Sequence, residues 1–126
     1  MKKVEWMGGC LKDLKAFPEE VRQEVGFCLF LAQQGGKAIN VVPLVGFGSA
    51  NVLEVVIDDS GDTYRAVYTV RFEKAIYALH AFQKKSKKGV ATPKRDLDLI
   101  RSRLKLAREH YAKHYGASAK KKDVSG

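Results

Sequence analysis

The sequence predicts a single α+β domain, in which N-terminal helices and a C-terminal helix pack on a small antiparallel β-sheet. Three observations indicate this class. The first third of the chain has helical apolar spacing, the middle has three strand-like runs with short connections, and the residues after Thr92 return to helical spacing. A chain of 126 residues is also long enough to bury about two-thirds of its unfolded surface without disulfides or metals.

The N-terminal third is predicted to be helical after a short opening strand. Val4–Trp6 is an apolar segment that can open the sheet, and Cys10–Lys15 is predicted as a short helix or turn. Pro18 is predicted at the first position of a longer helix, with two acids in its first turn, where the helix dipole favours them. Apolar residues then recur at helical spacing until Gly35 and Gly36 end the helix.

The middle of the chain is predicted to be an antiparallel meander. Val41–Phe47 is an edge strand or an ordered loop, because Pro43 and Gly46 interrupt it. The run DDSGD at residues 58–62 is the strongest turn signal in the chain, and a second, tight turn is predicted near residues 73–74. The predicted strands are Val52–Ile57, Thr63–Phe72 and Ala75–Gln83.

The last helix is predicted to begin with Thr92 as its cap and Pro93 at its first position. Its apolar residues form one stripe, made of Leu97, Ile100, Leu104, Ala107 and Tyr111. From Gly116 onward the chain lacks apolar content and reads as a disordered basic tail. The predicted division is therefore one domain over residues 1–115 and a tail over residues 116–126.

Positive charge is concentrated in the second half of the chain. Residues 1–70 carry a net charge of −2 and residues 71–126 a net charge of +11, which together give +9. A localised excess of this kind favours a polyanionic partner, most often nucleic acid.

Cysteine usage and hydropathy indicate an intracellular protein. Cys28 lies in an apolar helical run, which favours a core residue over a disulfide partner of Cys10. The N-terminus has no apolar region typical of a secretory signal, and no run approaches the ~20 apolar residues of a membrane span. We therefore expect a cytoplasmic protein without membrane contact.

The hairpin formed by the last two strands gathers cationic side chains. A turn at residues 73–74 places Arg65 opposite Phe82, with His80 and Lys84 as diagonal neighbours. One face of the hairpin is then mixed, as a ligand-facing surface should be, and the other is almost wholly apolar. The mixed face holds Arg65, Val67, Thr69, Ile76, Ala78, His80, Phe82 and Lys84, and the apolar face holds Ala66, Tyr68, Val70, Tyr77, Leu79 and Ala81.

These residue types suit phosphate and RNA chemistry. The arginine fork presents fixed donors to a phosphate, and histidine can transfer protons near neutral pH. Phe82 offers a surface on which a base can stack, and further lysines add charges that track a backbone. The predicted catalytic residues are Arg65, His80, Lys84 and Lys85, and the predicted RNA-binding residues are Phe82, Lys87 and Lys88. Together they are the parts of a metal-independent ribonuclease, for which no metal or cofactor is expected.

Structural interpretations of the same residues remain open. Arg65 can instead form an ion pair with Glu54 across the sheet, and His80 can be a hydrogen-bonded structural residue. The lysines at positions 84, 85, 87 and 88 can belong to a solvated loop.

The chain resembles the RelE/ParE toxin superfamily, and within it the HigB-like, phage-associated branch. The resemblance rests on LKDLKAFPEEVRQEVG, on VLEVVIDDSGDTYRAVYTV and above all on LHAFQKKS…TP with its upstream YR. It implies a RelE-like fold, ribosome-dependent cleavage of mRNA and inhibition by a cognate helix-turn-helix antitoxin.

The resemblance also implies roles for individual residues. Arg65 matches the arginine that acts on the scissile phosphate, Lys84 and Lys85 match a basic pair, and His80 matches a common histidine. Many relatives carry a cation where this chain has Val56. Two other functions therefore stay open, namely inhibition of DNA gyrase, as in the ParE-like branch, and RNA binding without chemistry.

Overall fold

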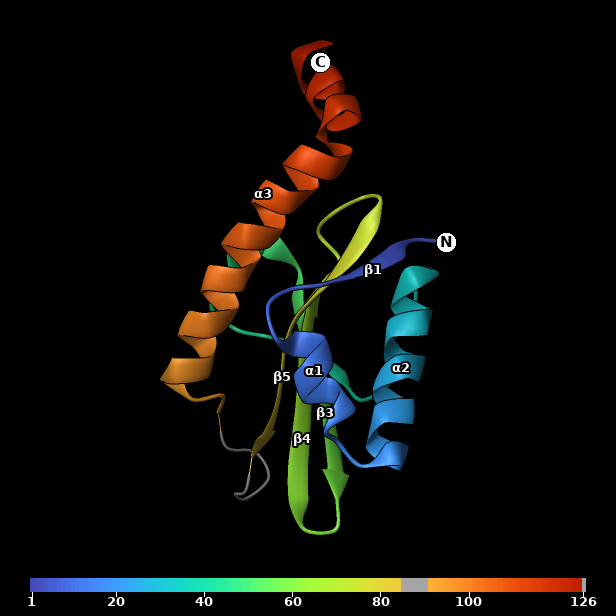
Figure 1. Ribbon diagram of the computed structural model, residues 1–126, viewed down its shortest axis with the longest axis vertical. Helices are drawn as coiled ribbons and strands as arrows, with labels where there is room; N and C mark the ends of the chain where they lie inside the picture. Colours follow the sequence, from blue (N-terminus) through green and yellow to red (C-terminus); the bar gives the residue numbers. More distant parts are fainter. Residues whose placement is uncertain (85–90, 126) are drawn as a thin grey trace.

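The computed structural model describes residues 1–84 and 91–125, with side chains described except at Ser49 and over residues 117–125. The α+β class predicted from the sequence is confirmed (Figure 1). The predicted site residues Lys85, Lys87 and Lys88 lie outside the described residues. In chain order the elements are β1 (Lys3–Trp6), α1 (Cys10–Lys15), α2 (Glu19–Gln33), β2 (Val41–Pro43), a short 3-10 helix η1 (Gly48–Ala50), β3 (Val52–Asp59), β4 (Asp62–Thr69), β5 (Ala75–Lys84) and α3 (Lys94–Ser125).

The strands form a five-stranded sheet in the order β1-β5-β4-β3-β2. The β3–β4–β5 meander is antiparallel, as predicted, and β2 is an antiparallel edge strand. β1 instead runs parallel to β5, so the prediction of a wholly antiparallel sheet is wrong at this edge. A parallel pair needs a long crossover connection. Here residues 7–74 separate the two strands, a relation that local patterns in the sequence do not report.

The β4–β5 register is the predicted one at the site end of the hairpin. Arg65 pairs with Phe82, and Val67 pairs with His80. An irregularity between Val67 and Tyr68 then shifts the pairing by one residue, so that Tyr68 pairs with Ala78. The face assignment is therefore wrong beyond this point, because a one-residue slip moves side chains to the opposite face. Ile76 and Ala78 lie with the core under α2, and Tyr77 and Leu79 lie with the core under α3.

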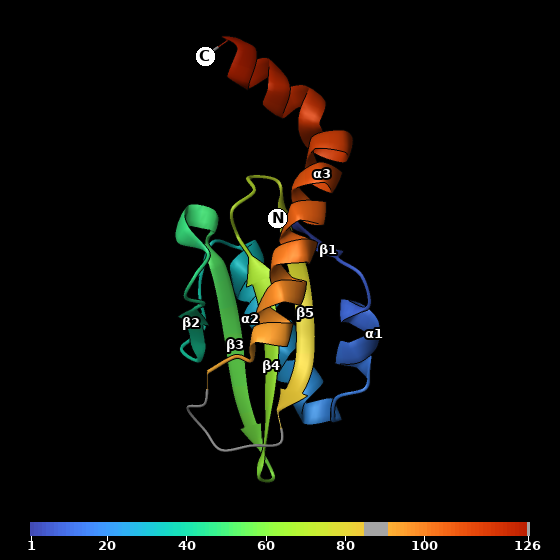
Figure 2. The same cartoon turned by 90° about the vertical axis from the view of Figure 1, so that its left-hand side faces the viewer.

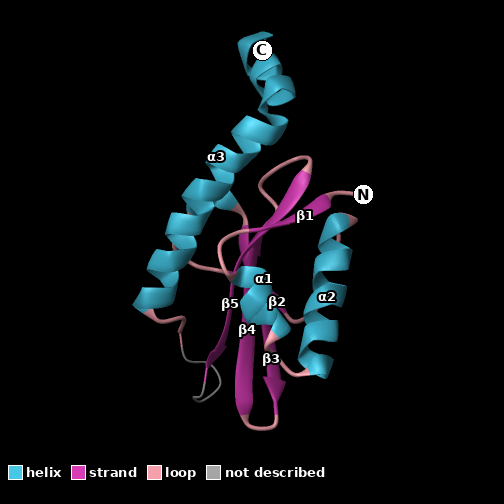
Figure 3. Ribbon diagram, in the orientation of Figure 1, coloured by secondary structure: helices cyan, strands magenta, loops and turns pink. Residues whose placement is uncertain are grey.

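Helices cover both faces of the sheet. α2 lies on one side and α3 on the other (Figure 3), and α3 runs along β4 and β5 (Figure 2). The buried side chains of α1, Cys10 and Leu14, belong to the same core as those of α2. The first core contains Val25, Cys28 and Tyr68, and the second contains Tyr77 and Ile100. The Arg65 face, predicted to face a ligand, is therefore covered in part by α3.

Both long helices begin one residue later than predicted. Pro18 is the N-cap of α2 and Glu19 its first residue. The carbonyl of Pro93 accepts the first backbone hydrogen bonds of α3, from the amides of residues 96 and 97. The prediction that Thr92 caps α3 is wrong, because its hydroxyl donates to the buried carboxylate of Glu54 instead.

α3 is helical through Ser125, and so the helix extends into the segment after Gly116 for which the sequence predicts a disordered tail. The division of the chain at residue 116 stays a prediction. Both cysteines are buried and free, as expected. Among the described residues, no helix combines the length and the apolar character needed to cross a membrane.

Packing of α3 on the sheet should account for a large share of the stability. The side chain of Ile100 is fully buried between α3 and the sheet, so Ile100→Ala should lower the free energy of unfolding by about 2–5 kcal/mol. Leu106→Ala, on the exposed side of the same helix, should change it by less than about 0.5 kcal/mol. Urea unfolding measures both, and equal costs would mean that α3 does not pack as described.

Candidate functional site

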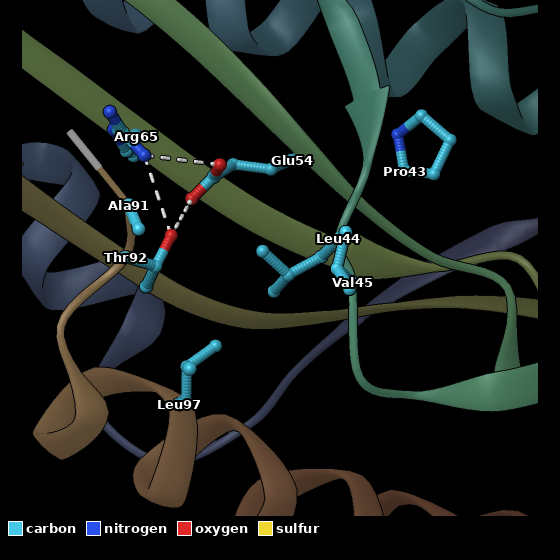
Figure 4. Close-up of a pocket in the computed structure, with 8 residues that line it drawn as sticks. All are labelled: Pro43, Leu44, Val45, Glu54, Arg65, Ala91, Thr92 and Leu97. Carbon is cyan, nitrogen blue, oxygen red and sulfur yellow. Dashed lines mark hydrogen bonds and ion pairs between the residues drawn. The ribbon is translucent and has the colours of Figure 1, made fainter. Parts of the chain in front are cut away.

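A pocket of about 370 Å³ lies where the start of α3 approaches the sheet and the loop after β2 (Figure 4). Its size falls in the range of sites for small ligands or single nucleotides. Apolar side chains form most of its wall, and an arginine, a carboxylate and a threonine hydroxyl form the polar part. The lining residues are Pro43, Leu44, Val45, Glu54, Arg65, Ala91, Thr92 and Leu97.

Arg65, Glu54 and Thr92 form a closed set of hydrogen bonds in this pocket. A terminal nitrogen of Arg65 lies 3.3 Å from Glu54 Oε1 and 3.4 Å from Thr92 Oγ1. The Thr92 hydroxyl donates to the other carboxylate oxygen of Glu54, at 3.0 Å. The side chains of Arg65 and Glu54 are only 6% and 4% exposed. The ion pair that the sequence left as an alternative for Arg65 is therefore present, and it holds the guanidinium in one orientation.

The strand register explains how Arg65 and Glu54 meet. In the antiparallel β3–β4 pair, Arg65 lies opposite Val56, and Glu54 lies opposite Val67. Glu54 is therefore a diagonal neighbour of Arg65 on the same face, within reach of a long side chain. Val56 is the direct neighbour of Arg65 in this pair. The charge of Arg65 is thus matched by one acid and has no second cation opposite it.

Lys84 lies at the end of β5 and is buried. Its ammonium group donates to the carbonyl oxygen of Ala91, which lines the pocket. Burial lowers the pKa of Lys84, and the nearby positive charge of Arg65 lowers it further, while Glu54 and Asp96 act in the opposite direction. A lysine with a lowered pKa gives up a proton more readily than an exposed lysine does.

His80 is held on both sides of its ring. Nε2 lies 2.8 Å from a carboxylate oxygen of Asp96, and Nδ1 lies 3.5 Å from a guanidinium nitrogen of Arg103. Because arginine can only donate and a carboxylate only accepts, these neighbours favour a ring that carries its proton on Nε2. Phe82 stacks on the ring with centroids 4.7 Å apart. The structure therefore brings His80 and Phe82 together, as predicted, and their two rings stack on each other.

One short segment contacts Arg65, His80 and Lys84, the three described side chains of the predicted catalytic set. The carbonyl oxygen of Ala91 contacts Lys84, the hydroxyl of Thr92 contacts Arg65, and the carboxylate of Asp96 contacts His80. The segment from Ala91 to Asp96 thus presents three oxygen atoms to three side chains of the hairpin. An anionic ligand that entered here would have to replace some of these oxygens.

Asp96 and Arg103 are site residues that the sequence did not single out. Both lie in α3, and neither belongs to the apolar stripe that defined the helix in the sequence. The sequence indicates these two residues only through their spacing, because an acid and a base seven residues apart lie on one face of a helix. Among the described residues, no three His, Cys, Asp or Glu side chains gather closely enough to hold a metal ion.

The stability of the protein should require both members of the buried ion pair between Arg65 and Glu54. Arg65→Met should destabilise the protein by about 3–5 kcal/mol, because it leaves the carboxylate of Glu54 buried beside Thr92 without its counter-charge. The double variant Glu54→Leu/Arg65→Met should recover most of that loss. Lys94→Ala breaks an exposed ion pair with Asp98 and should cost less than about 1 kcal/mol. Chemical unfolding of the natural protein, the single variants Glu54→Leu and Arg65→Met and the double variant measures the coupling, and additive costs would refute it.

Lys84 should make stability depend on alkaline pH. Its pKa in the folded state lies below the ordinary 10.5, so between these two values the unfolded chain binds more protons than the folded chain. The free energy of unfolding of the natural protein, relative to Lys84→Met, should therefore rise as pH increases from neutral toward 10.5. Lys12→Met, which removes an exposed amine, gives the baseline. If the free energy of unfolding of the natural protein, relative to Lys84→Met, instead falls over this range, the pKa of Lys84 is raised in the folded state.

The family of the protein follows from a match that contains this site. Residues 12–105 match the family model described as Phage derived protein Gp49-like (DUF891). No curated protein and no solved structure matches the chain. The matched segment begins in α1 and ends in α3, and so it includes Arg65, Glu54 and Lys84. It covers about three-quarters of the chain, and the protein therefore belongs to the family of Gp49-like phage-derived proteins.

Proposed function

We propose that this protein is the toxin of a type II toxin–antitoxin system, of the RelE/ParE superfamily and its HigB-like branch, and that it cleaves translated mRNA without a metal. The observation that carries the proposal is the contact between Arg65 and Glu54 on the wall of a pocket, with Lys84 bound beside them. An acceptor of protons, a permanent cation and a lysine of lowered pKa are the groups that this reaction needs.

The proposed reaction is an attack of a ribose 2′-hydroxyl on the adjacent phosphate. Glu54 takes the proton from the 2′-oxygen as that oxygen bonds to phosphorus, and Arg65 stabilises the extra negative charge on the phosphate. The bond from phosphorus to the 5′-oxygen breaks, and this oxygen takes a proton from the ammonium group of Lys84. The products are a 2′,3′-cyclic phosphate and a 5′-hydroxyl end.

His80 has a different part in this proposal. Its catalytic role, predicted from the sequence, stays a prediction, while both ring nitrogens already contact Asp96 and Arg103. We assign it a positioning role, in which it ties the start of α3 to β5. Lys85 remains a predicted catalytic residue, and Lys87 and Lys88 remain predicted RNA contacts.

The partners of the proposed toxin are translated mRNA, the ribosome and a cognate helix-turn-helix antitoxin. Phage-derived family membership fits a mobile toxin gene of this kind. The ribosome can hold the substrate in the reactive geometry, which compensates for the missing cation at Val56. The site of action would then be the cytoplasm, and the antitoxin should be encoded in a neighbouring reading frame and co-purify with the toxin.

Cleavage in cells tests this function. Brief induction should cut a translated reporter within its coding region and leave the same reporter without a start codon largely intact, as primer extension measures. Glu54→Gln and Arg65→Lys keep the size or the charge of the residue and should lower the cleavage rate on the order of 10²–10³-fold. Lys94→Ala, at an exposed ion pair on α3, is the matched control.

Two outcomes would contradict the proposal. If the natural protein cuts neither reporter and induces a DNA-damage response, it acts on gyrase. If Arg65→Lys, with unchanged unfolding behaviour, cuts as fast as the natural protein, Arg65 does not stabilise the transition state.

A further inference from the structure

A second hollow lies directly beside the Arg65 pocket, and none of the residues proposed for cleavage lines it. It has a volume of about 470 Å³ and lies between α3 and the loop that follows β2. We call it the α3 groove. Its lining residues are Gly46, Phe47, Arg101, Leu104, Lys105 and Arg108.

The α3 groove continues the pocket along α3. Leu97 lines the pocket, and Arg101, about one helical turn further on, lines the groove. On the other side the loop contributes Val45 to the pocket and Gly46 to the groove. The two hollows are therefore consecutive, and one extended ligand can occupy both.

Gly46 allows the loop to approach the helix closely. Its φ is +101°, in the region that favours glycine. A Cβ atom at this position would lie 3.4 Å from a guanidinium nitrogen of Arg101. The backbone of Gly46 therefore forms the loop side of the groove, and it faces Arg101 on the helix side.

Three cations form one row on the helix side of the groove. Arg101, Lys105 and Arg108 are spaced by four and three residues, so they share one face of α3 and span roughly 10 Å along its axis. At roughly 3.4 Å per phosphate of a stacked strand, this length corresponds to about three phosphates.

Two acids of α3, Asp98 and Glu109, lie near this row, and the charge of Asp98 is already matched. Asp98 accepts hydrogen bonds from Lys94 at 2.9 Å and from Arg101 at 3.4 Å, and the bond from Lys94 is the main reason that its pKa is lowered. Among the described residues, neither Lys105 nor Arg108 forms an ion pair. The positive charge of these two residues is therefore available to a ligand.

Phe47 supplies a flat surface at the same place. The guanidinium of Arg101 lies over its ring, 5.1 Å from the ring centroid. The ring is partly buried against the core under α3, to which Leu104 belongs, so it is held in position. A nucleobase can stack on such a ring in the place that the guanidinium of Arg101 holds, and arginine can stack on the base in turn.

We propose that the α3 groove binds single-stranded RNA beside the cleavage site, with phosphates on Lys105 and Arg108 and one base on Phe47. The proposal rests on the proposed function in that it places the flanking nucleotides of the same substrate. A single strand fits because its base faces are free to stack, whereas a duplex hides them between neighbouring base pairs.

Salt-dependent binding tests the phosphate contacts. The probe is a labelled 2′-O-methyl RNA dodecamer, which lacks the nucleophilic hydroxyl and so reports binding by the full chain without cleavage. For Lys105→Ala/Arg108→Ala, the slope of log affinity against log salt should become shallower by about 1.4, or about 0.7 for each phosphate that the variant no longer neutralises. Lys12→Ala/Lys15→Ala, on exposed residues of α1 across the sheet, removes equal charge and should leave the slope within about 0.3 of the natural value.

Stacking is tested separately at Phe47. Phe47→Leu keeps an apolar side chain against the core and should weaken binding roughly 5- to 150-fold without changing the salt slope. Phe47→Trp should restore affinity. Phe30→Leu, on the exposed face of α2, is the matched control.

Three results would overturn the proposal. They are equal slope changes for the α1 and α3 charge variants, unchanged affinity of Phe47→Leu, and tighter binding of duplex DNA or of a poly-glutamate peptide than of the single strand. Because the probe cannot be cleaved, these results are independent of whether the protein cuts mRNA in cells.

Discussion

The ion pair between Arg65 and Glu54 is the contact on which the site depends. Both side chains are almost fully buried, and each would be costly to bury alone. Thr92 completes the set by accepting from the arginine and donating to the carboxylate. The hairpin strands β3 and β4 and the later approach to α3 are therefore joined at one point. Because both side chains are almost fully buried, little water reaches either charge, and each needs the other as its partner.

The same contact makes the position of α3 part of the site. Ala91, Thr92 and Asp96 each place an oxygen against a basic side chain of the hairpin. The apolar stripe of α3 fixes where the helix packs, and these three oxygens fix its first turn relative to Arg65, His80 and Lys84. A change at the start of α3 should therefore alter the electrostatics of the pocket even when the core is unchanged.

The Arg65 pocket and the α3 groove differ in whether their positive charges are paired with an acid. In the pocket, Arg65 is matched by Glu54, which suits exchange of one anionic partner for another during a reaction. In the α3 groove, Lys105 and Arg108 have no such partner among the described residues, which suits sequence-independent attraction of a phosphate backbone. A substrate strand that crosses both would be attracted by the groove and positioned by the pocket.

The sequence by itself determined the α+β class, the meander and the register at the site. These features follow from short-range signals, namely apolar periodicity, the 58–62 turn and the single spacing that places Arg65 opposite Phe82. The tertiary structure alone decided the rest. β1 pairs with a strand about seventy residues away, the irregularity at Val67–Tyr68 exchanges the faces of Tyr77 and Ala78, and Thr92 bonds to Glu54 rather than capping α3. Each of these depends on which groups are buried together, because desolvation forces polar side chains to find partners that no local pattern in the chain specifies.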